Sequence, residues 1–174
     1  IELARLAEAD PFAGVPDPSQ LSRPVDHPDL DTYDGSVDGI DAKSAVDRAL
    51  AGERAAFDAD PRITNSEGAT FTRATGRSAL VTSGGFAGES RGSSVSIVVS
   101  PLADDADGKK QGSYYWDSRR HLASLRDPAS IGIEAARRTV RKLGATKIES
   151  AELPVIFDPD AGRSMLGLLA GCIM

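Results

Sequence analysis

The sequence predicts an α+β (mixed α/β) fold in which an antiparallel β-meander sheet packs against helices. Residues 62–118 are rich in β-branched and aromatic residues, and turn-forming residues separate them into short stretches, as in a meander. Helical periodicity flanks this region on both sides, at residues 41–60 and 127–144. The 174 residues, 40% of them hydrophobic and 26% charged, are enough for one globular core.

Three regions are expected along the chain. Residues 1–40 should contain the remnant of a helix and then a surface loop, because they are rich in Asp, Pro and Gly and show no sustained period. The α+β domain with the meander should span residues 41–150. Residues 151–174 should begin a following region that is cut off, because the apolar run at 165–174 stops abruptly. We therefore expect a fold truncated at the C-terminus, ending in a buried helix.

The two main helices have recognisable beginnings and ends. Asp41 can cap the first helix, which should stop at Asp60-Pro61. Its apolar residues recur at spacings of three, four and seven: Ala42, Ala45, Val46, Ala49, Leu50 and Phe57. Asp127-Pro128 is a cap followed by a proline, and Gly144 is a suitable left-handed stop for the second helix. Within it, Glu134 and Arg138 are one turn apart and can pair.

The predicted strands are residues 68–75, 78–83, 86–100 and 111–118, with turns at Gly76-Arg77 and Ser83-Gly84-Gly85. The third strand is long enough to need a bulge or break near Gly92. Alternation places Tyr114 and Trp116 on one face of the last strand, and Tyr115 and Asp117 on the other. A short buried strand is expected at 153–157, before a final helix that opens at Asp158-Pro159.

Charge is unevenly distributed around a net value of −6. Residues 1–60 hold 14 acidic and 5 basic side chains, whereas residues 109–147 hold 10 basic and 3 acidic ones. The basic segment could face an acidic partner, but we favour a solvated helix with cations gathered near its C-terminal end. Charge alone does not support direct binding of nucleic acid. A single cysteine, no signal pattern and no apolar run long enough to span a bilayer together predict a cytoplasmic location.

No complete catalytic, cofactor-binding or metal site is evident, so we assign no residue to any of these roles. A zinc site needs three or four converging ligands, and His27, His121 and Cys172 are too few and too far apart. Each histidine is interpreted as a surface or hydrogen-bonding residue, and Cys172 as a small core residue.

Other polar motifs also have simple structural interpretations. The glycine-rich run at 84–92 lacks the Gly-Lys-Ser/Thr ending of a phosphate loop and is interpreted as a hairpin turn and bulge. Asn65-Ser66-Glu67-Gly68 contains the only asparagine and is interpreted as an Asx-type turn between strands. The carboxylates Glu67 and Asp117 stay unassigned, because sequence cannot show whether they converge.

Several of these segments, taken in order, resemble successive signatures of the TldD/PmbA family, whose members are also called candidate modulators of DNA gyrase. The matching segments are Asp10-Pro11-Phe12-Ala13-Gly14-Val15-Pro16, Asp29-Leu30-Asp31-Thr32-Tyr33-Asp34, Ile63-Thr64-Asn65-Ser66-Glu67-Gly68-Ala69, Thr82-Ser83-Gly84-Gly85-Phe86-Ala87-Gly88, Tyr114-Tyr115-Trp116-Asp117, Ala135-Ala136-Arg137-Arg138-Thr139, Lys147-Ile148-Glu149-Ser150 and Pro154-Val155-Ile156-Phe157-Asp158-Pro159. Each motif alone is weak, but their order over nearly the whole chain is fairly specific.

The resemblance implies a cytoplasmic peptidase of two related subunits that degrades unfolded peptides. It also implies that the TldD-type subunit carries zinc on a His-Glu-x-x-x-His helix and a later cysteine. The corresponding region here looks like Arg163–Met174, which holds no histidine or glutamate. The chain therefore resembles the PmbA (TldE) type, a non-catalytic subunit without its own zinc site. The partners implied are a TldD-type zinc peptidase subunit, or a second copy in a dimer, and unfolded peptide.

Two other functions stay open at this point. One is a stand-alone homodimeric peptidase whose site lies in a missing C-terminal half. The other is a binding module that regulates a DNA enzyme through residues 109–147, with Arg137, Arg138, Arg141 and Lys142 as the basic side chains to test. Whether the protein is itself an enzyme is therefore undecided by the sequence.

Overall fold

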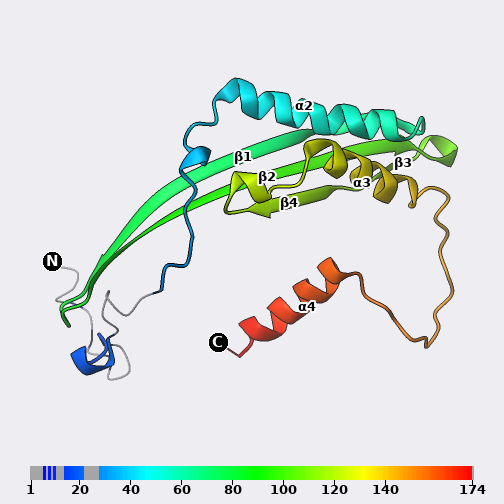
Figure 1. Cartoon of the computed structure of the whole chain (residues 1–174). Helices are drawn as coiled ribbons and strands as arrows, with labels where there is room; N and C mark the ends of the chain where they lie inside the picture. The colour runs from blue at the N-terminus through cyan, green and yellow to red at the C-terminus, as the bar shows by residue number, and fades with distance from the viewer. Residues whose placement is uncertain (1–5, 7, 9, 11–13, 22–27, 174) are drawn as a thin grey trace. The chain divides into compact units, whose positions relative to one another are not determined.

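The structure is a computed structural model that describes residues 6, 8, 10, 14–21 and 28–173. The chain divides into two compact units, Ile1–Gly144 and Ala145–Met174, and each is described by itself (Figure 1). The helix remnant expected within residues 1–40 falls mostly outside the described residues, and so does His27. The described part of that region contains two short 3-10 helices, η1 (Pro18–Gln20) and η3 (Gly35–Val37).

The first unit contains the predicted antiparallel sheet. Its strands are β1 (Ile63–Val81), β2 (Ala87–Asp104), β3 (Lys110–Gly112) and β4 (Tyr115–Arg119). β2 is the central strand: β1 pairs along one edge, while β3 and β4 pair with successive parts of the other edge. The α+β class and the antiparallel sheet are therefore confirmed.

One long strand replaces the first two predicted strands. Gly76 pairs directly with Gly92 and Arg77 with Arg91, so the chain continues straight through the predicted turn at Gly76-Arg77. The predicted bulge near Gly92 is also wrong, since the register of the β1–β2 pair shifts only between Ile63 and Asn65 and between Ser66 and Ala69. A glycine within a strand pattern fits either a turn or a paired position, and here the partner strand selects pairing.

The turns at the other glycine motifs can now be placed. Gly85 has a φ of +94° and its N–H donates to the Thr82 carbonyl at 3.1 Å, which confirms the hairpin turn between β1 and β2. The segment Asn65–Gly68 lies inside β1 and not between strands, which corrects the prediction. Its side chains still bond locally, because the Ser66 N–H donates to Asn65 Oδ1 and the Gly68 N–H donates to Ser66 Oγ, both at 2.8 Å. This local bonding accompanies the register shift.

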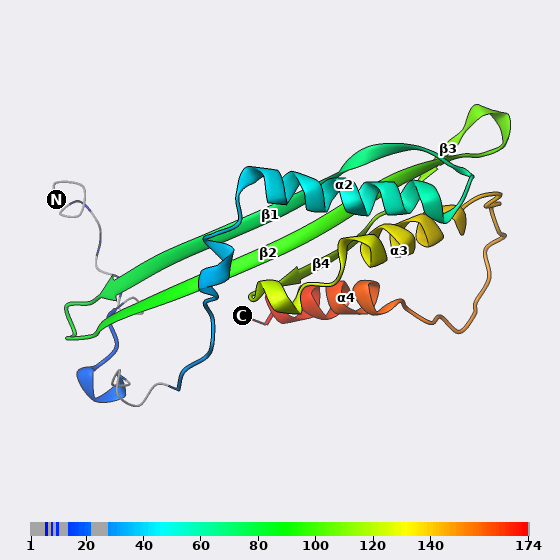
Figure 2. The same ribbon diagram turned by 45° about the horizontal axis from the view of Figure 1, so that its top comes forward.

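Two helices, α2 (Ala42–Ala59) and α3 (Pro128–Val140), cover one face of the sheet (Figures 1 and 2). Each begins at the predicted cap: the Ser44 N–H donates to Asp41 at 2.7 Å and the Ser130 N–H to Asp127 at 3.3 Å. Beneath them lies a core of fully buried side chains from both layers: Ile97, Val99, Ala103, Ile131, Ala135 and Ala136.

The helices approach each other most closely at two glycines. A Cβ added to Gly132 of α3 would lie 2.0 Å from the carbonyl oxygen of Gly52 in α2. Since real Cβ atoms essentially never come within 3.0 Å of such an atom, only glycine fits here without displacing a helix. Tyr115 packs against the core and Asp117 is only 7% exposed, so the two share one face of β4, as predicted, and that face is the covered one.

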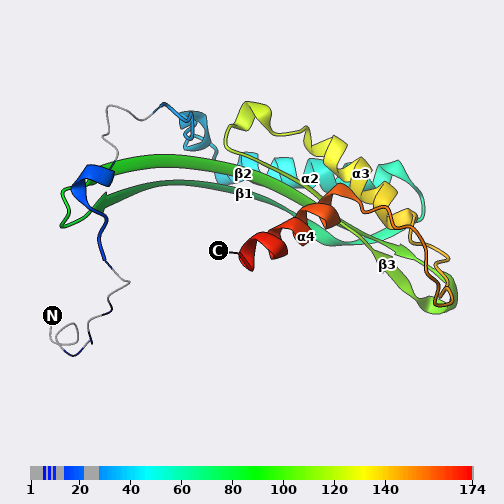
Figure 3. The same ribbon diagram turned by 90° about the horizontal axis from the view of Figure 1, so that it is seen from below.

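β1 and β2 extend well past the helices (Figures 1 and 3). We call residues 72–92 the ribbon; they comprise the exposed part of β1, the turn and the first residues of β2. Every residue of β1 from Thr72 to Val81 is exposed, whereas the buried residues of β2 lie between Ser93 and Ala103. The same two strands therefore have a covered half and a bare half.

The second unit contains α4 (Pro159–Gly171), which begins at the predicted Asp158 cap. The expected strand at 153–157 is not formed, and its side chains are exposed, Ile156 to 98%. The expected burial of the last helix is likewise wrong, since Leu168 is 73% exposed. The apolar pattern does form the predicted helix, but the described residues of its own unit provide no second layer to cover it. None of the described helices has the length and hydrophobicity needed to cross a membrane.

Candidate functional site

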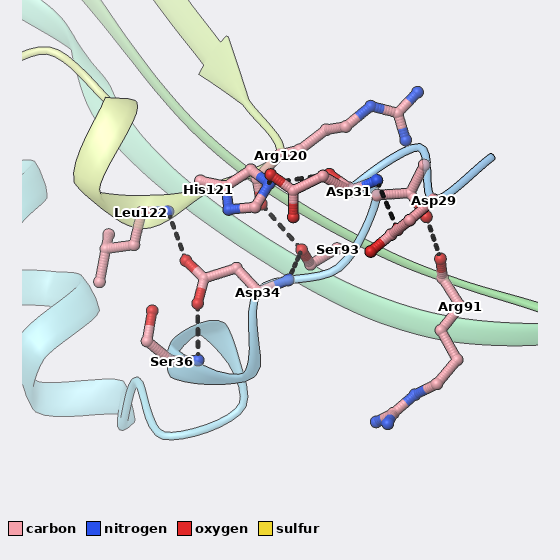
Figure 4. Close-up of polar contacts among 10 residues, drawn as sticks. Asp29, Asp31, Asp34, Ser36, Arg91, Ser93, Arg120, His121 and Leu122 are labelled. Carbon is pink, nitrogen blue, oxygen red and sulfur yellow. Dashed lines mark hydrogen bonds and ion pairs between the residues drawn. The ribbon is translucent and has the colours of Figure 1, made fainter.

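A polar site forms where residues 28–38, which we call the strap, cross the edge of β2. β4 pairs with β2 only as far as Val95, and the strap follows at the same edge. The Ser93 N–H donates to the Thr32 carbonyl at 3.0 Å, and Thr32 Oγ1 donates to the Arg91 carbonyl at 2.6 Å. The strap therefore pairs with β2 at the start of the ribbon (Figure 4).

Asp34 organises the strap from its centre. Its carboxylate accepts from the N–H groups of Ser36 and Leu122, each at 2.8 Å, and its own N–H donates to Ser93 Oγ at 2.8 Å. Hydrogen bonds from Ser36 and then from Leu122 lower the pKa of Asp34, because they stabilise the ionised form. Ser93 Oγ in turn donates to the Arg120 carbonyl at 2.8 Å. One carboxylate thus ties together the strap, β2 and the segment after β4.

His121 contacts the strap at Asp31. Its Nε2 lies 2.8 Å from the Asp31 carbonyl oxygen and 3.4 Å from Asp31 Oδ2. Asp31 has a φ of +47°, and its N–H donates to Asp29 Oδ1 at 2.9 Å. His121 is therefore a hydrogen-bonding histidine, as predicted.

Tyr33 and Asp38 form the other end of the site. The guanidinium of Arg91 lies 3.8 Å from the centre of the Tyr33 ring, and the Tyr33 hydroxyl donates to Asp38 Oδ2. Thr75 Oγ1 donates to Asp38 Oδ1 at 2.7 Å. These bonds, Thr75 first and Tyr33 second, lower the pKa of Asp38, and the bond to Asp38 raises the pKa of Tyr33.

In the part of the chain that the structure describes, three shallow hollows adjoin the strap. The smallest, about 240 Å³, we call the arginine pocket, and it is lined by Tyr33, Asp38, Thr75, Gly76, Arg77 and Arg91. A second hollow of about 630 Å³ runs along the strap and contains the acidic side chains Asp29, Asp31 and Glu89 as well as Arg91. The third, about 400 Å³, includes Gly92 and Arg120. In Figure 4 the side chains of Arg91 and Arg120 point in opposite directions, so Arg120 does not add to the arginine pocket.

The residues considered for a metal do not converge. Among the described residues, no three His, Cys, Asp or Glu side chains are grouped so that they could hold an ion. His121 faces Asp31, while Cys172 lies in the other unit and is exposed, which corrects its prediction as a core residue. This donor set does not fit a zinc site.

The two unassigned carboxylates are now placed. Glu67 is exposed and lies in the bulged part of β1. Asp117 is buried, accepts from the Arg126 N–H at 3.0 Å and pairs with Arg119 at 2.9 Å. Asp117 therefore holds the connection between β4 and α3 in place.

Several cations of the basic segment 109–147 are engaged within the fold. Arg137 and Arg138 both pair with Glu134, at 2.7 and 3.0 Å, and Lys142 Nζ donates to the Gly112 carbonyl at 2.6 Å. The predicted Glu134–Arg138 pair is confirmed. These contacts favour the interpretation of a solvated helix over that of a patch for an acidic partner.

Sequence reasoning missed the arginine pocket and the role of Asp34. The bonded pairs are far apart in the chain: Asp34 and Leu122 are separated by 88 residues and Thr75 and Asp38 by 37. The only local signal was the run of aspartates at 29–34.

Comparison with known proteins identifies relatives over almost the whole chain. Residues 35–143 match the model of the PmbA/TldA metallopeptidase central domain. The chain is 31% identical over 173 residues to Metalloprotease PmbA of Escherichia coli O157:H7, covering 99% of this chain and 37% of that protein. It is 30% identical to the Metalloprotease PmbA homolog of Haemophilus influenzae, with the same coverage. The chain thus spans less than two fifths of the length of these relatives.

Solved structures show the same fold. A candidate modulator of DNA gyrase from Bacteroides thetaiotaomicron matches with a TM-score of 0.77 and 24% identity, over 85% of this chain and 33% of that one. A candidate modulator of a DNA gyrase from Thermotoga maritima gives 0.63 and 21%, over 69% and 27%. TldE from Thermococcus kodakarensis gives 0.61 and 16%, over 80% and 30%. At these identities the likeness is one of fold.

Proposed function

The chain belongs to the PmbA/TldD family, and from this membership we propose that it serves as the PmbA/TldE-type, non-catalytic subunit of a zinc peptidase assembly acting on unfolded peptides. Its curated relatives are named metalloproteases. In this proposal the zinc belongs to a TldD-type partner, because the histidine and cysteine donors of the described residues do not converge. The chain's contribution is then to pair with the partner and to help hold the peptide.

The observation that carries this proposal is the bare ribbon. A two-stranded hairpin is only marginally stable in water, and here β1 from Thr72 to Val81 is exposed throughout. Leu80 and Val81 near its tip are 60% and 76% exposed. A surface of this kind gains stability when another protein surface covers it, so it suits a subunit interface or a wall of a peptide-holding cavity.

A reconstitution experiment tests the proposal. The protein is mixed with a TldD-type subunit from the same organism, and cleavage of an unfolded peptide is measured. We expect cleavage by the mixture and little by either protein alone. Full activity of the TldD-type subunit alone, unchanged by addition of this protein, would contradict the proposal.

A pair of variants connects that experiment to the ribbon. Leu80→Asp places a charge on the exposed ribbon and is expected to weaken both pairing and cleavage. Val46→Asp makes the same kind of change at an exposed position of α2 and should leave both unchanged. Equal effects of the two variants would remove the ribbon from the interface.

The stand-alone homodimeric peptidase is separated from this proposal by metal analysis of the full-length protein. Stoichiometric zinc bound by this protein without a TldD-type partner would favour the homodimer.

The lone cysteine precludes an internal disulfide and suits a reducing compartment, so we extend the proposal to an assembly in the cytoplasm.

A further inference from the structure

Two arginines lie directly opposite each other on the ribbon. Arg77 of β1 and Arg91 of β2 are paired in register, so their side chains share one face of the hairpin. Like charges placed opposite each other destabilise a strand pair. Among the described residues no carboxylate oxygen lies within 4.0 Å of either guanidinium. An anion bound between them would relieve this repulsion.

The position of Arg91 is fixed before any ligand arrives. Its guanidinium stacks on the Tyr33 ring at 3.8 Å, and its backbone carbonyl accepts from Thr32 of the strap. Stacking uses the flat face of a guanidinium and leaves the N–H groups at its edge available as donors. A planar carboxylate is the anion that this edge binds best, through two parallel hydrogen bonds.

The carboxylate that lines the arginine pocket, Asp38, does not take this place. Both oxygens of Asp38 accept hydrogen bonds from hydroxyl groups, Oδ1 from Thr75 and Oδ2 from Tyr33. Glu89, which shares the face of Arg91, lines the neighbouring hollow and makes no ion pair with either arginine. Arg73 lies on the same face of β1 and also acts on Asp38. The lining of the arginine pocket itself contains two arginines and one engaged aspartate, so its charge is positive even though acidic side chains line the neighbouring hollow.

The size of the pocket limits what it can hold. At about 240 Å³ it accommodates a carboxylate and a few neighbouring atoms, but not a folded segment. Gly76 forms part of its wall, between the two side chains of β1 that line the pocket, Thr75 and Arg77.

We infer that Arg77 and Arg91 bind a carboxylate, and that its source is the C-terminus of an extended peptide. The choice of a peptide rests on the proposed function, whereas the carboxylate rests on the two arginines alone. Nothing in this assignment requires zinc or a catalytic step, so peptide binding can be measured directly.

The experiment compares two versions of one labelled peptide by fluorescence anisotropy at low salt. The probe is a ten-residue Ala/Gly/Ser peptide with fluorescein at its N-terminus and either a free C-terminal carboxylate or an amide. We expect the free acid to bind about tenfold more tightly, as two charge-assisted hydrogen bonds imply. Arg77→Gln and Arg91→Gln should each reduce binding of the acid to the level of the amide. Arg54→Gln, the same loss of charge at an exposed position of α2, should leave binding unchanged.

Any other result of these binding measurements would contradict one specific part of the inference. Equal binding of acid and amide, or an equal loss in Arg54→Gln, would overturn the pocket. An amidated peptide with one internal glutamate that binds as tightly as the acid would move the source from the terminus to a side chain. Inorganic phosphate that competes better than acetate would overturn the preference for carboxylate.

The two experiments separate failure of the pocket from failure of the proposed function. If the acid and amide peptides bind equally but reconstituted cleavage still needs this protein, only the pocket fails. If the acid peptide binds more tightly than the amide but cleavage does not need this protein, only the proposed function fails.

Discussion

The covered half of the β1–β2 hairpin and the ribbon differ in what surrounds them, although the same two strands form both. Along the covered half, alternate residues of β2 are fully buried: Ile97 and Val99 beneath α2 and α3, and Val95 against Val37 and Ile40. Along the ribbon, the same alternation continues into Arg91 of β2 and Arg77 of β1, which face solvent and the strap.

This difference separates residues that hold the fold from residues that are free to bind. Hydrophobic burial stabilises the covered half at roughly 25 cal/mol per Å² of apolar area. The ribbon has little such burial, so its order depends on backbone pairing and on the strap bonds at Ser93 and Thr32. Substitutions in the two halves should therefore have different consequences, for stability in one and for binding in the other.

The largest expected effect is the loss of a core side chain. Ile97→Ala should lower the free energy of unfolding by about 4 kcal/mol, because Ile97 is fully buried and its removal leaves a cavity. Leu80→Ala in the ribbon removes a similar side chain at an exposed position and should change it by less than about 0.5 kcal/mol. Urea unfolding measures both. Comparable losses would show that the ribbon is packed as tightly as the core.

The second largest loss of stability is expected at the contact between the helices. Gly132→Ala should cost about 3 kcal/mol, since its methyl group would overlap the Gly52 carbonyl and push α3 away from α2. Gly162→Ala in α4 adds the same methyl group where no atom lies within 4 Å, and it should cause no loss. A Gly132→Ala variant as stable as the parent would contradict this packing.

Removal of the central strap carboxylate should have an intermediate effect. Asp34→Ala leaves the N–H groups of Ser36 and Leu122 without their acceptor, so it should lower the free energy of unfolding, although by less than the two substitutions above. Asp58→Ala, at an exposed position of α2, is the matched control and should change stability by less than about 0.5 kcal/mol. Chemical denaturation followed by circular dichroism compares them, and equal values would mean that Asp34 does not hold the strap.

The smallest effect is a pH dependence located in α3. Hydrogen bonds from Arg137, opposed by partial burial and aided by Arg138, lower the pKa of Glu134 to about 2. Because this pKa is depressed in the folded state, its stabilisation is present above about pH 4.5 and is lost as the pH falls towards 2.

The matched variant isolates this contribution from other acids. Between pH 4.5 and 2, the parent should lose about 1 kcal/mol more of its unfolding free energy than Glu134→Gln does. Stability curves that stay parallel over this range would show that the ion pairs contribute nothing measurable.

The two helices that cover this half of the hairpin were also the elements that the sequence predicted best. Asp41 and Asp127-Pro128 mark helix starts through local chemistry, and the apolar spacing that follows each of them is local too. The prediction failed where a residue's structure depends on a segment distant in the sequence. Gly76 is paired because Gly92 lies opposite it, and residues 153–157 form no strand because none of the described segments pairs with them.

The contacts between the strap and the ribbon could not have been derived from the sequence in the same way. The contacts of the strap with the rest of the fold join residues 37 to 90 positions apart, such as Asp38 with Thr75 and Asp31 with His121. No periodicity or cap connects such positions. The resemblance to a family identified the segments, and only the fold showed which of their side chains meet.

Hydrogen exchange at the ribbon gives the most direct test of the central claim, that the bare half of the hairpin exists to be covered by a partner. Exchange of the amides is measured for the protein alone and after addition of a TldD-type subunit. We expect the amides at 72–81 to exchange fast in the protein alone and to become protected in the mixture, while those of Val95–Ala103 stay slow in both. A ribbon that exchanges equally fast with and without that subunit would contradict the claim.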